Sequence, residues 1–248
     1  MFANSSTRRL GVNEWFSNTL EEQYSLIRIY SSSSTGEVSQ LRHKTHGYDI
    51  IKRVYHATDS VYQILHTLSH HNIPKVYEVI YYEDTVTVLE EYINGLTISD
   101  VLDSGLYKER GVITIVSSLC DALSILHEHG IVHRDIKPEN VIIDNSGSVK
   151  LIDFNASKVY KPHRSQDTQL LGTAGYAAPE QFGITQSDKR VDIYALGILM
   201  NVMLTGEYPS KLFYQGRLEK VIEKCTQLDP NKRYQNVAEL KHNLPNEN

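Results

Sequence analysis

The sequence predicts an α+β protein in two lobes, a small antiparallel sheet with one short helix followed by a larger, mainly helical part. Two observations support this prediction. Segments rich in β-branched and aromatic residues, separated by Ser- and Gly-rich turns, come first. After Gly95 the apolar residues recur at intervals of three and four, which is typical of amphipathic helices. We expect the first lobe to span about residues 21–93 and the second residues 94–248.

Strands of the first lobe are predicted from alternating apolar residues and the turns that bound them. They are expected at residues 24–30, 38–42, 48–54, 76–82 and 85–89, with a helix at 61–68. In the second lobe, helices are predicted at residues 112–129, 191–204, 221–228 and 237–244. The helix at 191–204 is apolar nearly all round, so we expect it to be buried.

The composition is that of an ordinary soluble globular protein, with 22% charged and 40% hydrophobic residues among 248. A formal net charge of −5 argues against a nucleic-acid partner, which would normally require a basic surface. The apolar stretch at residues 193–204 is too short to span a bilayer, and no secretory signal is visible, so no membrane attachment is expected. Cys120 and Cys225 fall in helical patterns and are expected to be core thiols in a reducing, cytoplasmic compartment.

The eleven histidines invite a metal interpretation. His70, His71, His127 and His129 lie at predicted helix ends, where capping or solvation is the commoner role. No Cys/His spacing indicates a zinc site.

The segment from His133 to Asn140, with Asp153 thirteen residues later, has the most specific chemistry in the chain. It reads His-Arg-Asp-Ile-Lys-Pro-Glu-Asn, and the later acid begins Asp-Phe-Asn. An acid, a lysine, an amide and a second acid thus lie on two short loops separated by one hairpin. Phosphoryl transfer from a metal-bound nucleotide needs such a set: an acceptor for the hydroxyl proton, oxygen ligands for Mg²⁺ and a nearby cation.

These strings resemble the catalytic and metal loops of the eukaryotic-type serine/threonine protein kinases, with Asn155 where the family has glycine. The resemblance implies that Asp135 accepts the hydroxyl proton and Lys137 neutralises the transferred phosphate. It also implies that Asn140 and Asp153 hold Mg²⁺. A lysine at position 137 is the pattern of serine/threonine rather than tyrosine kinases. Asn155 is expected to tolerate a positive φ in place of glycine.

Nucleotide-binding motifs of the first lobe are degenerate. Gly36 and Val38 match the end of a phosphate-binding GxGxxGxV hairpin, while Ser31 and Ser33 replace its first two glycines. A plain serine-rich turn is the alternative interpretation. The strand residue Lys52 is expected to pair with the ATP phosphates.

The segment Glu90–Gly95 resembles the family's hinge between the lobes. The resemblance implies that adenine is bound by backbone groups, the carbonyl of Glu91 and the N–H of Ile93. Glu90 is then expected at the back of the nucleotide pocket.

The helix glutamate that should pair with Lys52 falls on Val61. Glu90 is the expected substitute partner, since a carboxylate in a partly desolvated pocket is costly unless paired. Asp59 is a less favourable candidate, because it lies on the wrong helix face. On this interpretation Glu90→Leu lowers activity and Val61→Glu is tolerated.

The segment Gly172–Glu180 resembles the end of a kinase activation segment. The resemblance implies that Thr173 bonds Asp135 and Lys137, and that Glu180 forms a buried ion pair with Arg233. It also implies that Asp192 braces the backbone of the catalytic loop.

Phosphorylation inside the activation segment is expected at Thr168, or alternatively at Ser165. A phosphate there could pair with Arg134 and Lys158 and order the segment. A solvated loop residue is the alternative role for Thr168.

The chain is therefore identified as a member of the protein kinase family. It is predicted to be an active, autophosphorylating serine/threonine kinase that uses ATP and Mg²⁺ on a protein substrate. The expected catalytic set is Asp135, Lys137, Asn140, Lys52 and Thr173. One alternative is a pseudokinase or scaffold, suggested by the missing helix glutamate and the serine-rich hairpin. Another is a small-molecule kinase of the aminoglycoside type, which the activation segment disfavours. The substrate and the oligomeric state stay open.

Overall fold

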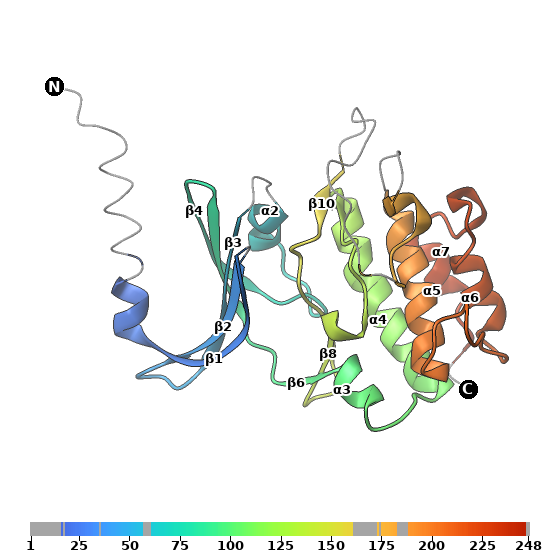
Figure 1. Cartoon of the computed structure of the whole chain (residues 1–248), viewed down its shortest axis with the longest axis horizontal. Coiled ribbons are helices and arrows are strands. Elements are labelled where there is room, and N and C mark those ends of the chain that lie inside the picture. Colours follow the sequence, from blue (N-terminus) through green and yellow to red (C-terminus); the bar gives the residue numbers. More distant parts are fainter. Residues whose placement is uncertain are drawn as a thin grey trace. The chain divides into compact units, whose positions relative to one another are not determined.

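The computed structural model describes residues 16, 18–34, 36–56, 61–160, 173, 175–182 and 188–246. These residues form two compact units. The first comprises the chain up to Leu68 together with Lys75–Tyr92, and the second comprises Ser69–Pro74 and the chain from Ile93 onward. Figure 1 draws the first mainly in blue and teal and the second from green to red.

The first unit is built on a five-stranded antiparallel sheet in the order β1-β2-β3-β5-β4. Its elements are β1 (Tyr24–Ser33), β2 (Gly36–His43), β3 (Asp49–His56), α2 (Val61–Thr67), β4 (Val76–Tyr82) and β5 (Thr85–Glu91). The predicted strands and the predicted helix are all present.

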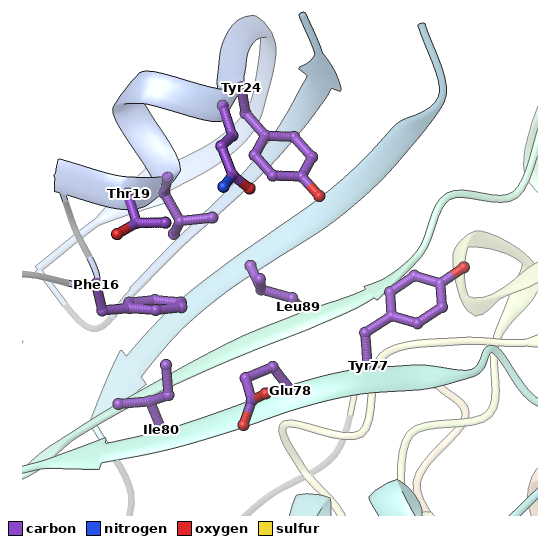
Figure 2. Close-up of a pocket in the computed structure, with 9 residues that line it drawn as sticks. Phe16, Thr19, Tyr24, Tyr77, Glu78, Ile80 and Leu89 are labelled. Atoms are coloured by element: carbon purple, nitrogen blue, oxygen red, sulfur yellow. The ribbon is translucent and has the colours of Figure 1, made fainter. Parts of the chain in front are cut away.

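The two faces of this sheet have different coverings. On one face Leu20, from the helical residues 18–23, packs against Leu41, Ile50 and Leu89. A pocket of about 480 Å³ opens beside this contact, and Figure 2 shows Leu89 pointing into it. On the other face the ring of Tyr55 lies 5.5 Å from the ring of Tyr62 in α2.

The second unit is mainly helical, with two small antiparallel sheets, β6-β8-β9 and β10-β7. Its helices are α3 (Ile98–Leu102), α4 (Glu109–Glu128), α5 (Arg190–Thr205), α6 (Glu219–Cys225) and α7 (Val237–His242). Its strands are β6 (Gly95–Thr97), β7 (Ile131–Val132), β8 (Val141–Asp144), β9 (Val149–Leu151) and β10 (Lys158–Val159). Three single turns complete it: η1 (Pro138–Asn140), η2 (Pro179–Phe182) and η3 (Pro230–Lys232). The predicted α+β fold class is confirmed.

The core of the second unit forms around α5, which contacts α4 and α6 (Figure 1). Twelve residues of α5 are buried, as its all-round apolar pattern predicts. A Cβ on Gly197 would come within 2.6 Å of the Cβ of Cys225, so only glycine allows α6 to approach this closely. Cys120 and Cys225 are free and buried, which confirms them as core thiols.

Helix α4 is long and apolar enough to cross a membrane by length and composition alone. Nine of its residues are nevertheless buried inside the unit, as in the core helix of a globular domain. The helix is followed by His129, whose ring Nδ1 lies 2.9 Å from the carbonyl oxygen of Ile125, so this histidine caps the helix as expected.

Candidate active site

The catalytic loop lies between β7 and β8 and brings three predicted residues into contact. The hydroxyl of Thr173 donates to Asp135 Oδ1 at 2.7 Å. The ammonium of Lys137 lies 2.9 Å from Asp135 Oδ2 and 2.8 Å from Thr173 Oγ1. The predicted contacts of Thr173 with both residues are confirmed. Asp135 is thus a carboxylate that two donors hold in a fixed orientation.

These donors also set the ionisation of Asp135. Burial raises the pKa of a carboxyl group, but the hydrogen bonds from Thr173 and Lys137 outweigh it, so the pKa of Asp135 lies below its ordinary value. Asp135 is therefore ionised near neutral pH, which is the state in which it can accept a proton.

The backbone of the catalytic loop is held by Asp192 in the first turn of α5. Its carboxylate accepts from the backbone N–H of His133 at 3.0 Å and of Arg134 at 2.8 Å. Arg134 has φ of 71°, a left-handed conformation that a side chain disfavours, and these two bonds help to fix it. The predicted brace is confirmed.

His127 completes the brace, with Nε2 2.8 Å from Asp192 Oδ2. Burial raises the pKa of Asp192, but hydrogen bonds led by that of His127 lower it below the ordinary value. The expectation that His127 caps a helix end or is solvated is wrong, because its side chain is 6% exposed and faces the carboxylate. The sequence around His127 does not reveal this contact, because its partner Asp192 lies 65 residues further along the chain.

His133 is fully buried between the two loops. Its Nε2 donates to the carbonyl of Ile152 at 3.2 Å, and its ring lies edge-on to Phe154 with centroids 5.1 Å apart. Burial lowers the pKa of His133, so the ring is neutral and keeps Nδ1 as an acceptor for the Asp135 N–H at 3.4 Å. This histidine links the catalytic loop to the segment that begins at Asp153.

The two predicted metal ligands lie on adjacent loops, because the N–H of Ile152 donates to the carbonyl of Asn140 at 2.9 Å. The Asn140 amide nitrogen donates to Asp135 Oδ2 at 2.9 Å and to the Asp135 carbonyl at 2.8 Å. The amide oxygen of Asn140 is therefore turned away from Asp135. This oxygen and the carboxylate of Asp153 are hard-oxygen donors of the kind that Mg²⁺ prefers, and their metal-binding roles stay predictions.

Asn155 does not have the positive φ that was expected at its position. Among the described residues, positive φ at a non-glycine occurs at Glu83, Arg134 and Asp153, where φ is 65°. Asn155 is not one of them, so its expected tolerance of a positive φ is not needed here. The unusual conformation falls on Asp153, a residue type that tolerates it better than most.

The predicted ion pair between Glu180 and Arg233 is also confirmed. It is bidentate, with distances of 2.6 and 2.9 Å. The neighbouring Gln181 donates to the carbonyl of Arg134 at 3.0 Å, so η2 is tied to the catalytic loop. Thr168 and Ser165 lie outside the described residues, and their phosphorylation stays a prediction.

In the first unit, the serine-rich segment is a tight hairpin. Ser31 pairs with Val38 and Ser33 with Gly36, and the hydroxyl of Ser33 donates to the carbonyl of Gly36 at 3.4 Å. A Cβ on Gly36 would lie 2.5 Å from the carbonyl oxygen of Val54, so packing of β2 on β3 already requires glycine there. The phosphate-binding roles of these residues stay predictions.

The strand register places Lys52 and the hairpin residue Val38 on different faces of the sheet, and the phosphate-binding role of Lys52 stays a prediction. Residues directly opposite in antiparallel strands share a face, and neighbours along a strand alternate. Lys52 lies opposite Ser39 and Leu89, on the face covered by the helical residues 18–23. Arg53 instead lies opposite Val38, on the other face.

The predicted partner of Lys52 is wrong because of this register. Glu90 lies on the face of Arg53, and its carboxylate is 2.5 Å from Arg53 Nε. Val61 is 1% exposed in the core of the first unit, so a glutamate there would bury a charge and would not be tolerated. Asp59 lies outside the described residues.

The hinge residues fall on either side of the division between the units. Glu91 ends β5, where its N–H donates to the carbonyl of Lys75 at 2.8 Å. Ile93 is buried at the start of the second unit. Their adenine-binding roles stay predictions.

The hydrogen bond from Thr173 to Asp135 predicts how activity depends on pH when the hydroxyl is removed. In Thr173→Val the carboxylate of Asp135 loses a donor while it stays buried, so its pKa rises. A base works only when deprotonated, so the acidic limb of the kcat/KM profile should move to higher pH. The same hydrogen bond also orients the carboxylate. A hydrogen bond to a charged group contributes about 1.5–3 kcal/mol, so loss of this orientation should lower the rate near neutral pH about tenfold or more. Thr173→Ser keeps the hydroxyl and should restore the limb; an unmoved limb in the valine variant would contradict this role.

Comparison with known proteins identifies the class that this fold and site define. The family model of the protein kinase domain matches residues 32–244. Because the match covers most of the chain, the chain belongs to the protein kinase family.

Its relatives are named as serine/threonine kinases in two of the three cases compared. The chain is 32% identical over 184 residues to serine/threonine-protein kinase PknB of Mycolicibacterium smegmatis, covering 63% of this chain and 29% of the relative. Over 198 residues it is 30% identical to the probable serine/threonine-protein kinase PknB of Lactococcus lactis, covering 70% and 32%. Over 214 residues it is 32% identical to sperm motility kinase Z of Mus musculus, covering 79% and 43%.

The chain thus spans less than half the length of these relatives. The family match makes it a protein kinase domain, and the likeness gives no support to the pseudokinase alternative.

Proposed function

We propose that this chain transfers the γ-phosphate of ATP, with Mg²⁺, to serine or threonine hydroxyls of a protein substrate, its own chain included. The observation that supports this most is the triangle of Asp135, Lys137 and Thr173, with Asn140 bonded to the same carboxylate. A charged base with a cation beside it suits an acceptor hydroxyl that loses its proton as it attacks phosphorus.

Each group of the chain has a separate part in this chemistry. Asp135 receives the hydroxyl proton, and Lys137 balances the charge of the transferred phosphoryl group. The oxygens of Asn140 and Asp153 would hold Mg²⁺, which neutralises charge on the nucleotide phosphates. Asp192, His127 and His133 keep the two loops in place.

A cytoplasmic location and the lack of nucleic-acid and membrane partners are further proposals, which rest on composition.

The test is transfer of label from γ-labelled ATP to the chain itself and to peptides with serine, threonine or tyrosine as the single acceptor. We expect label on serine or threonine and none on tyrosine, and no transfer when EDTA removes Mg²⁺. The Asp135→Asn variant, which has the same shape without the base, is the control. Transfer by this variant at the wild-type rate, or label on tyrosine alone, would contradict the proposal.

A further inference from the structure

A buried ion pair lies in the sheet of the first unit, and it joins Glu90 to Arg53 in place of the predicted Lys52. Arg53 of β3 and Glu90 of β5 are joined by a 2.5 Å contact between Nε and Oε1. Their side chains are only 7% and 4% exposed. The strands are hydrogen-bonded neighbours, so the pair is internal to the sheet.

The register fixes the face of this pair. Arg53 lies directly opposite Val38 of β2 on one side and Val88 of β5 on the other. Ser31 lies opposite Val38 in β1, so the hairpin residues share this face. Arg53 is therefore the cation of β3 on the face of the proposed nucleotide hairpin, whereas Lys52 lies on the opposite face with Leu89 (Figure 2 shows the pocket on that face).

A gain in folding stability does not explain why this ion pair is buried. Desolvating two charges offsets much of their attraction, and replacing a buried ion pair with apolar residues is often neutral or stabilising. An arginine that a carboxylate orients has a planar set of donors suited to phosphate oxygens. The charge pair is thus better explained by a ligand that needs a positioned cation.

The origin of the carboxylate is also informative. Helix α2 has no acidic residue along Val61–Thr67 and buries Val61, Tyr62 and Leu65. The partner of Arg53 comes instead from the adjacent strand β5. Formation of the pair therefore depends on strand pairing within the sheet and not on the position of a helix.

We propose that Arg53, positioned by Glu90, contacts the nucleotide phosphates in the role first predicted for Lys52. The inference rests on the proposed function, since it assumes that the chain binds ATP. Because the anchor is part of the sheet, the cation is in place whatever the position of α2.

The experiment is isothermal titration calorimetry with Mg²⁺ and a non-hydrolysable ATP analogue. Arg53→Met alone would leave Glu90 buried without its cation and could unfold the unit. The double variant Arg53→Met/Glu90→Met removes both charges and should fold, as checked by circular dichroism. We expect it to bind about tenfold or more weakly, and Arg53→Lys to be intermediate. Lys52→Met is expected to bind within about twofold of wild type.

Arg42→Met is the matched control, because Arg42 is paired with Asp49 in the same sheet but its side chain is 51% exposed. It should bind as wild type does. Wild-type affinity in the folded double variant, or a tenfold loss in Lys52→Met, would overturn the role of Arg53 while the proposed function stands. No binding by the wild-type chain at millimolar analogue would overturn the proposed function and this inference with it.

Discussion

Asp153→Asn is expected to lower turnover by a factor of about 10²–10⁴ and to abolish the Mg²⁺ dependence of nucleotide binding. A bound metal supplies several kcal/mol of charge stabilisation, and each 1.36 kcal/mol is tenfold in rate. Asparagine is chosen because Asp153 has φ of 65°, which asparagine also adopts readily. The variant thus removes the charge and keeps the backbone.

Asp135→Asn gives the matching comparison on the neighbouring loop. It too should lose about 10²–10⁴ in kcat, the usual contribution of a general base, while Mg²⁺-dependent nucleotide binding is retained. Binding is measured by calorimetry and turnover with labelled ATP. A near-normal rate in Asp153→Asn would contradict its metal role. Equal loss of nucleotide binding in both variants would contradict the separation of the two roles.

The second unit could be predicted closely because its motifs are contiguous. Asp135, Lys137 and Asn140 lie within six residues, so their relative positions follow from one loop. Contacts with distant residues, such as those of Thr173 and Asp192, came from the resemblance and not from spacing. The strands β7 and β10 have two residues each, which is too short for any periodic pattern to reveal.

In the first unit, the sequence alone does not show which face of the sheet a strand residue occupies. Lys52 and Arg53 are adjacent cations in one strand, and both are positively charged near neutral pH. They differ in which face of the sheet they occupy, and a shift of one residue exchanges the faces. The face is set by pairing of β3 with β2 and β5, which lie next to it only after folding. The same limit applies to His127, whose partner Asp192 lies on another helix.

Arg233→Met is expected to destabilise the second unit by about 3–5 kcal/mol, the usual cost of breaking a buried ion pair. The Arg233 side chain is fully buried, and its donors are all used. Two go to Glu180, and three go to the carbonyls of Gln227, Arg190 and Leu228. Its loss leaves the Glu180 carboxylate and these carbonyls without their donor. Arg233→Lys should recover only part of the loss, because lysine lacks the planar fork.

Urea unfolding followed by circular dichroism measures the effect, with Lys241→Met as the matched control. Lys241 pairs with Asp121 at 2.6 Å, but both side chains are 40% exposed. An exposed pair contributes about 0–1 kcal/mol, so this variant should unfold nearly as wild type does. An equal loss of unfolding free energy in Arg233→Met and Lys241→Met would contradict the prediction, because it would show that the buried pair contributes no more than the exposed one. Because Gln181 beside Glu180 bonds the Arg134 carbonyl, Arg233→Met should also lower activity under conditions where the chain is still folded.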